Sequence, residues 1–166
     1  MDNTHSIAKD AYISTCGTYR YWLTREWDES NPLLVWLMLN PSTADASQDD
    51  ATMRKCMSYA RKWGYGGITV INVYALRSRD PKNLWKVSDP VGPHNNRWIS
   101  LWMGYARRRG SKIICGWSKH PKPERIDEIL EIAENERVDL EVVEMGQHGP
   151  KHPLYLKGDL KPVRFR

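Results

Sequence analysis

The sequence predicts a single α/β domain in which helices cover both faces of a mainly parallel sheet. Apolar, β-branched runs alternate with amphipathic segments along the chain, and this alternation is typical of parallel strands joined by helical crossovers. A length of 166 residues agrees, because it suits one domain with one continuous core. We therefore expect residues 1–166 to form a three-layer α/β/α domain around a four-stranded mainly parallel sheet with an added N-terminal antiparallel strand.

The first elements follow from side-chain patterning. Residues 19–27 are rich in aromatic side chains with a rough alternation, which predicts a strand, and the turn-forming residues 28–32 favour a hairpin into the next run. Residues 33–39 form a continuous apolar run that stops at Asn40, as expected of a strand buried on both faces. Residues 49–63 place their apolar side chains at helical spacing and predict a helix.

The second half of the chain repeats this alternation. Its expected elements are a strand at 68–73, a helix at 94–109, a strand at 112–115, a helix at 124–135 and a strand at 140–145. A loop rich in proline and glycine at 81–93 separates the first two, and loops of that length are often functional. The basic tail, residues 157–166, is expected to be irregular.

Composition excludes several classes of protein. Charged residues make up 27% of the chain and the mean hydropathy is −0.65, so we expect a soluble, cytoplasmic protein without a membrane partner. Three cysteines without a C-x-x-C pair supply neither a disulfide framework nor an iron–sulfur cluster. No strand is followed by G-x-G-x-x-G or G-x-x-x-x-G-K-[ST], so we expect no nucleotide cofactor. His148 and His152 have i, i+4 spacing, but Gly149 and Pro150 between them break a helix, so we expect no bound metal.

The net charge of +5 favours a polyanionic partner such as DNA, although a moderately basic protein without such a partner would have the same charge. We expect the protein to act as a monomer. Charge alone leaves both interpretations open, so the choice between them depends on the polar residues at the predicted strand ends.

Those polar residues follow the four predicted strands of the parallel sheet. Asn40 and Ser42 follow the first strand, Asn72 ends the second, Trp117 follows the third and His152 follows the fourth. Ligands of such sheets bind outside the carboxyl ends of the strands, so we expect these side chains to share one site. Taken singly, each asparagine is better explained by hydrogen bonding within the following turn, and His152 by an ordinary place in a loop.

Three short motifs of the chain resemble the sequence motifs of a known enzyme family. Residues 37–42 (LMLNPS) resemble the G-x-N-P-G/S motif after the first strand of uracil-DNA glycosylases, especially the mismatch-specific and single-strand-selective branches. Residues 68–76 (ITVINVYAL) resemble their second strand, and residues 152–156 (HPLYL) resemble their H-P-S-P-L motif. The resemblance covers roughly residues 33–158. With LNPSTADA, RKWGYGG and HPLYL, the whole chain is also similar to an uncharacterised bacterial and phage family recorded as a domain of unknown function.

The resemblance implies a glycosylase-like fold and a DNA N-glycosylase that acts on a flipped base. It implies that Asn40 orients the attacking water, that Asn72 reads the edge of the base, and that His152 stabilises the departing base. It also implies that Leu156 fills the vacated stack. Ser42 stands where the most uracil-selective branch has a bulky tyrosine, which leaves room at C5 and favours a modified pyrimidine.

The chain departs from these motifs at three positions. Met38 replaces the glycine that permits close approach to the base, and Leu154 and Tyr155 replace the serine and second proline of H-P-S-P-L. The phosphate contact expected of that serine is therefore missing.

Acidic residues just after Asn40 offer a second way to activate water. Asp45 is our second candidate for that role, because a carboxylate can accept the proton that an amide cannot. Asp49 and Asp50 open the predicted helix, and N-capping explains them better than catalysis.

Cations and an aromatic side chain near the predicted strand ends complete the expected DNA-binding surface. Lys151, Arg77 and Arg97 are expected to contact phosphates, Arg97 from the start of the second helix, where capping by the preceding loop is the alternative. Trp117 could stack on a base.

Two other functions fit the same residues. A hydrolase of free nucleotides or nucleosides would use the same pocket without a duplex, and a non-catalytic module would recognise a modified base without cleaving it. Repair of damaged DNA and attack on hypermodified phage DNA would use identical chemistry.

Overall fold

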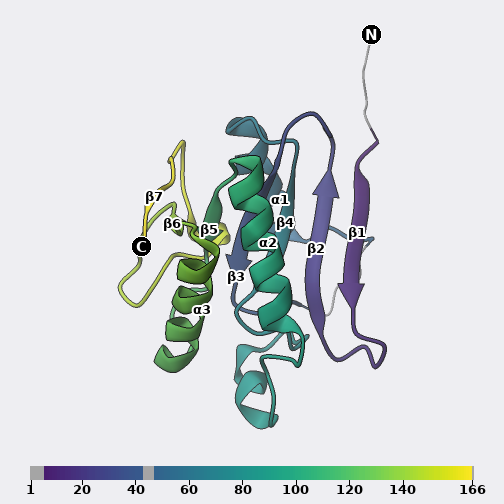
Figure 1. Cartoon of the computed structure of the whole chain (residues 1–166), viewed down its shortest axis with the longest axis vertical. Helices are drawn as coiled ribbons and strands as arrows, with labels where there is room; N and C mark the ends of the chain where they lie inside the picture. The colour runs from purple at the N-terminus through teal and green to yellow at the C-terminus, as the bar shows by residue number, and fades with distance from the viewer. Residues whose placement is uncertain (1–5, 43–46, 166) are drawn as a thin grey trace.

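The computed structural model describes residues 6–42 and 47–165. It is an α/β protein with a seven-stranded mixed sheet in the order β1-β2-β4-β3-β5-β6-β7 (Figure 1). The strands are β1 (Ala8–Ile13), β2 (Arg20–Glu26), β3 (Leu33–Met38), β4 (Gly67–Asn72), β5 (Ile113–Cys115), β6 (Glu141–Val142) and β7 (Val163–Arg164). The α-helices are α1 (Ala51–Lys62), α2 (Asn95–Arg109) and α3 (Pro123–Glu136).

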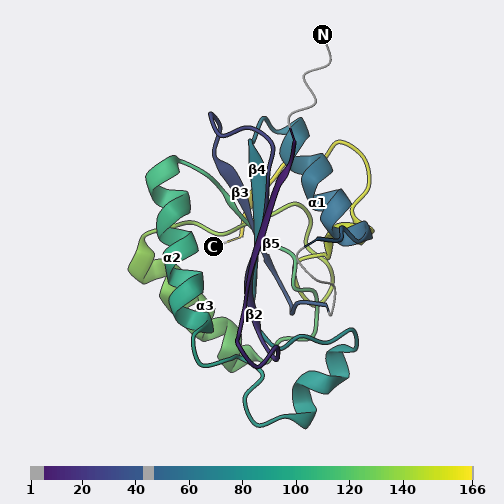
Figure 2. The same cartoon turned by 90° about the vertical axis from the view of Figure 1, so that its right-hand side faces the viewer.

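Helices cover both faces of the sheet. Figure 2 shows α1 on one face and α2 with α3 on the other. Each face has its own core: Trp36, Ile68 and Met53 belong to the core beneath α1, whereas Ile71, Ile99 and Ile129 belong to the core beneath α2 and α3. No helix in the described part of the chain is both long and apolar enough to span a membrane.

The centre of the sheet is parallel. β3 pairs in parallel with both β4 and β5, and β5 pairs in parallel with β6. Every residue of β3 and β4 is buried, which confirms the prediction that residues 33–39 form a strand covered on both faces. The carboxyl ends of these four strands therefore lie along one edge of the sheet.

The predicted hairpin between residues 19–27 and 33–39 is wrong. β2 pairs antiparallel with β1 and with β4, and β3 lies between β4 and β5. β1 supplies the hairpin partner, but its exposed edge position leaves most of its side chains in solvent, so it has no apolar pattern to predict it.

Two segments expected to be irregular contain short elements. The loop at 81–93 begins with a 3-10 helix, η1 (Pro81–Lys86), whose first turn is capped by Asp80. The tail at 157–166 contains β7, which pairs antiparallel with β6. Both are too short to show a hydrophobic period in the sequence.

Candidate functional site

A cavity of about 660 Å³ lies at the carboxyl ends of the parallel strands. β3 continues into α1 on one face of the sheet, whereas its neighbour β5 continues into α3 on the other face. The connections thus diverge between the neighbouring strands β3 and β5, which is where ligands bind in open α/β sheets. The fold itself places the cavity at this point.

All four strand ends contribute to this cavity. Asn40, Asn72, Trp117 and His152 line it, as does Ser42, so the predicted convergence of these five side chains is confirmed. Thr52, Met53 and Cys56 of α1 also line the cavity.

Asn40 is held firmly by the loops around it. Its Nδ2 atom donates to the backbone oxygens of Ser78 (2.9 Å), Pro41 (3.1 Å) and Leu76 (3.3 Å). These contacts show that Asn40 has the structural role expected of an asparagine after a buried strand. They also fix the direction of the amide, so that its Oδ1 atom can accept a hydrogen bond from a molecule in the cavity.

Asn72 presents a buried donor to the cavity. The side chain is 1% exposed, and its Nδ2 atom has no hydrogen-bond partner among the described residues. A buried donor without a partner costs about 1–3 kcal/mol, a cost that a ligand acceptor would remove. This atom is the strongest indication in the cavity of what the ligand must offer, namely a hydrogen-bond acceptor.

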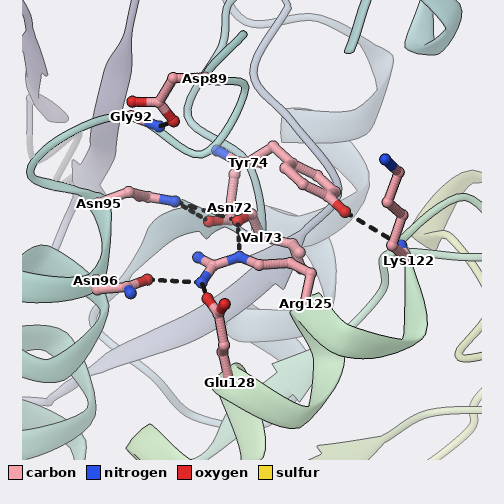
Figure 3. Close-up of polar contacts among 10 residues, drawn as sticks. All are labelled: Asn72, Val73, Tyr74, Asp89, Gly92, Asn95, Asn96, Lys122, Arg125 and Glu128. Atoms are coloured by element: carbon pink, nitrogen blue, oxygen red, sulfur yellow. Dashed lines mark hydrogen bonds and ion pairs between the residues drawn. The ribbon is translucent and has the colours of Figure 1, made fainter. Parts of the chain in front are cut away.

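A buried polar network holds the backbone at Asn72 from behind (Figure 3). Asn95 donates through Nδ2 to the backbone oxygens of Asn72 (2.9 Å) and Val73 (3.2 Å). Arg125 donates through Nε to the oxygen of Val73 (2.9 Å) and also binds the side chains of Asn96 (2.7 Å) and Glu128 (2.6 Å). Helices α2 and α3 therefore fix the position from which Asn72 reaches the cavity.

The segment that carries His152 lies against the ends of β3 and β5 because two glycines allow it. A Cβ atom on Gly116 would lie 3.0 Å from Sδ of Met38 and 3.1 Å from Cδ of Pro153. One on Gly149 would lie 2.4 Å from the backbone oxygen of Ser118, and Gly149 has φ of 153°. Larger side chains at these positions would push His152 away from the cavity.

His152 caps the short 3-10 helix η2 (Pro153–Tyr155). Its Nδ1 atom accepts a hydrogen bond from the backbone nitrogen of Leu154 (3.2 Å), so in the neutral ring the hydrogen is on Nε2. Burial lowers the pKa of His152 below its ordinary value, and the nearby charge of Asp50 opposes this only in part. His152 is therefore a neutral hydrogen-bond donor at the cavity wall at neutral pH.

Trp117 belongs to both the core and the cavity. It is buried and packs edge-on against Phe165, at 5.6 Å between ring centroids. Trp117 also lines the cavity wall, where a base could stack on it. Ser42 lines the same cavity and is half-buried.

The acidic residues after Asn40 divide into three cases. Asp50 caps α1 by accepting from the backbone nitrogen of Met53 (2.8 Å), which confirms the capping interpretation, and it also lines the cavity. Asp49 is not the cap, because it pairs with the fully buried Arg25 at 2.7 Å. Asp45, the second candidate for activating water, lies outside the described residues.

The role assigned to Leu156 is wrong. The side chain is 2% exposed and belongs to the core beneath α1, so it cannot insert into a base stack. The neighbouring residues Leu154 and Tyr155 are 47% and 70% exposed and line the cavity, so they are the apolar side chains available to a nucleic acid. Because the chain turns at η2, Leu154 and Tyr155 of HPLYL face outward and Leu156 faces the core.

Replacing Leu156 by alanine should therefore lower stability rather than selectively weaken DNA binding. Leu→Ala in a core costs about 2–5 kcal/mol, and urea unfolding would measure the loss. The matched variant Leu154→Ala removes the same atoms from an exposed position and should change stability by less than about 1 kcal/mol. Equal stability of the two variants would contradict the burial of Leu156.

The three expected phosphate contacts lie outside the cavity lining. Lys151 pairs with Glu144, and Arg77 donates to the backbone oxygen of Gly17 (3.0 Å), so both have local structural roles. Arg97 is exposed on the first turns of α2. None of these three belongs to the cavity wall, although a nucleic acid on the surface could still reach Arg97.

The sequence did not reveal the cations that do line the cavity. Arg20, the first residue of β2, is 5% exposed there, and Arg79 and Lys119 are exposed at the same cavity. Arg20 precedes the parallel strands by many residues, and only the antiparallel pairing of β2 with β4 brings it to their ends. No signal within the segment 19–27 indicates this.

The fold is that of an α/β protein with a cavity at the point where its strand connections diverge. In the described part of the chain, no group of three or more His, Cys, Asp or Glu side chains is placed to hold a metal ion. The chain belongs to the family described as "Protein of unknown function (DUF1643)", whose model matches residues 20–154. The curated proteins include no match to the sequence. The matched residues contain every side chain assigned above to the cavity except Tyr155.

Proposed function

We propose that this protein hydrolyses the N-glycosidic bond of a pyrimidine nucleotide flipped out of DNA. The observation that carries the proposal is the buried amide of Asn72, which lacks a protein partner and shares a cavity with Asn40 and His152. A carbonyl oxygen on a pyrimidine ring supplies the acceptor that this amide needs. A fixed amide donor would thus select and orient the base.

Asn40 supports the hydrolytic step. Its Nδ2 atom is held by three backbone oxygens, so Oδ1 can accept from a water molecule in a constant direction. An amide cannot take the proton of that water as a carboxylate can, so it orients the nucleophile without deprotonating it. We therefore expect slow turnover.

His152 supports departure of the base. Glycosidic cleavage passes through an oxocarbenium-like state, and negative charge builds on the leaving pyrimidine as the bond breaks. The neutral ring of His152 can donate from Nε2 to that developing charge, since its Nδ1 atom accepts from Leu154. The base leaves as an anion with the bonding electrons, and the water adds its oxygen at the sugar carbon. The proton that the water loses passes to solvent or to the base anion, which leaves a sugar hydroxyl and a neutral free base.

Two features support a modified pyrimidine as the base. The cavity of about 660 Å³ is larger than an unmodified pyrimidine ring requires, and the small side chain of Ser42 is part of its wall. A substituent at C5 would occupy the remaining space. The basic net charge of the chain favours DNA as the carrier of that base.

A hydrolase of free nucleotides is the second candidate, and the burial of Leu156 favours it. A DNA glycosylase must fill the space left by the flipped base, and the residue expected to do so is in the core. Leu154 and Tyr155 are exposed beside the cavity and would have to replace it. A free nucleotide needs no such side chain.

Base release from a panel of DNAs tests the proposal. Unmodified, uracil-containing and C5-modified DNAs are incubated with the protein, and alkali converts abasic sites to strand breaks. We expect breaks in one C5-modified DNA, and their loss by at least about 100-fold in Asn40→Ala. The control is Asn135→Ala, which removes an exposed amide of α3 and should leave the rate unchanged.

Other outcomes would overturn the proposal in different ways. Equal cleavage of unmodified uracil DNA would exclude selection at C5. Base release from free nucleotides alone would establish the second candidate. Retention of one modified DNA without any break would indicate a recognition module without catalysis.

A further inference from the structure

The outward face of α1 carries a row of exposed cations. Arg54, Arg61 and Lys62 are exposed at i, i+7 and i+8 spacing, and the exposed Ser58 lies between them at i+4. Residues at these intervals share one face of a helix. We call these four residues the α1 row. Because α1 contains no acidic residue, the helix brings no negative charge of its own to this face.

The surface is hollowed along this row. The four residues line a shallow hollow of about 380 Å³ together with Met57 and Asp49. Asp49 adds little negative charge there, because it pairs with Arg25 at 2.7 Å and with Lys9 at 3.7 Å. The hydroxyl of Ser58 is a neutral donor among the charged ones. The hollow therefore offers several donors to the oxygens of an anion.

Local contacts anchor the two arginines of the α1 row without neutralising them. Arg54 donates from Nη1 to the backbone oxygen of Asp49 (2.8 Å). The guanidinium of Arg61 lies over the ring of Trp27, at 3.9 Å from the ring centroid. Neither contact cancels a charge, since the partners are a backbone oxygen and an aromatic ring. Both guanidinium groups are thus held on the surface in their charged form.

The C-terminal tail adds to the positive surface. Lys62 pairs with Asp159 at 3.1 Å, which places the tail beside the end of α1. Both side chains are more than half exposed, so this ion pair is weak and a phosphate could replace it. Lys157 and Lys161 are also exposed, so the segment 157–161 brings two positive charges and one negative charge to this face.

The α1 row leads away from the candidate site. Thr52 and Met53 line the cavity, and Arg54 follows directly in the chain. A helix rises about 1.5 Å per residue, so the row from Arg54 to Lys62 is about 12 Å long. One strand of DNA carries a phosphate about every 3.4 Å of the duplex axis, so the row matches about three or four phosphates. A strand that delivers a base to the cavity could therefore continue along α1.

The opposite face of the sheet is a poorer surface for a polyanion (Figure 2). α2 ends in three arginines, but the neighbouring α3 carries six acidic residues and one arginine. The arginines are also remote from the cavity, because the start of α2, where Asn95 binds the backbone of Asn72, is the end that lies near it. The α1 face combines positive charge with a position beside the cavity.

We infer that the α1 row binds successive phosphates of the DNA strand whose base enters the cavity. The choice of DNA rests on the proposed function, whereas the choice of surface rests on the exposure, spacing and charge of the row. A lipid surface fits less well, because an interfacial helix needs apolar side chains beside its cations. In α1 the apolar residues Met53, Cys56 and Ala60 are buried in the core.

The salt dependence of DNA binding tests the inference. Fluorescence anisotropy measures binding of the full chain to a labelled, unmodified DNA duplex over a range of salt concentrations. Each phosphate contact contributes about 0.9 to the slope of log K against log salt concentration, so Arg54→Gln with Arg61→Gln should lower the slope by about 1.8. Arg54→Lys with Arg61→Lys keeps both charges and should keep most of the slope.

A matched double variant on the other face is the control. Arg107→Gln with Arg108→Gln removes the same charge from exposed positions of α2 and should keep the slope. Unfolding in urea verifies that each variant keeps its fold. If the lysine variant loses as much slope as the glutamine variant, the arginines act through packing rather than charge, and the inference is overturned.

The remaining outcomes separate the surface from the proposed function. An equal loss of slope in the α1 and α2 variants would show that net charge alone attracts DNA and would overturn the surface. Tighter binding of an RNA duplex of the same sequence would overturn DNA as the partner. Base release with no change of slope in the α1 variant would overturn the surface alone. Loss of slope in that variant, without base release from any DNA, would overturn the proposed function alone.

Discussion

Replacing His152 by asparagine is expected to lower the rate of base release by about 10²–10³-fold, the usual effect of removing one donor to a developing negative charge. Asparagine can still accept from the backbone nitrogen of Leu154, so η2 keeps its cap. It is too short to reach the leaving base as Nε2 does. Single-turnover base release on the preferred DNA would measure the change, and unfolding in urea would verify that the fold is kept.

The pH dependence provides a control for this role. Burial lowers the pKa of His152, so the neutral donor persists from alkaline pH down through the ordinary histidine value of about 6.5. Base release should therefore be constant across neutral pH and fall only in more acidic solution, where Nδ1 is protonated. A rate that rises as the pH falls through 6.5 would indicate a protonated histidine and contradict the proposed role.

The same lowered pKa has a consequence for stability. The unfolded chain binds the proton of His152 at a higher pH than the folded chain, so stability is fully present above about pH 6.5 and is lost as the pH falls through the folded pKa. His152→Asn should remove this part of the acid sensitivity. An unchanged dependence of stability on pH in the variant would contradict the burial of the ring.

Replacing Arg125 by methionine is expected to lower stability by about 2–3 kcal/mol, the effect of losing buried hydrogen bonds made by a charged donor. The variant leaves Asn96 without its partner and leaves Val73 with the hydrogen bond of Asn95 alone. It should also weaken base selection, because the backbone that carries Asn72 loses one of its supports (Figure 3). Urea unfolding and base release across the DNA panel would measure the two effects.

Glu128→Gln is the matched control for Arg125→Met. The Glu128 side chain is 55% exposed, and a glutamine in its place can still accept the hydrogen bond of Arg125. The control should therefore unfold almost as the unmodified protein does. A stability loss of equal size in both variants would show that the ion pair dominates, rather than the hydrogen bonds to the β4 end.

The order of the central strands and helices was predictable because buried elements have recognisable apolar patterns in the sequence. β3 and β4 are buried on both faces and read as unbroken apolar runs, and α1 shows its apolar face at helical spacing. Edge strands have no such apolar pattern. β1 is mostly exposed and β7 has two residues, so neither could be predicted from side-chain pattern alone.

The sequence by itself determined which polar residues follow the parallel strands, and hence that Asn40, Asn72 and His152 would meet at one edge of the sheet. This follows from local patterning and from the shared direction of parallel strands. Only the tertiary structure decided that Arg20 joins them and that Leu156 does not. The antiparallel pairing of β2 with β4 and the packing of Leu156 in the core beneath α1 depend on contacts between segments that are distant in the sequence, so no local pattern predicts them.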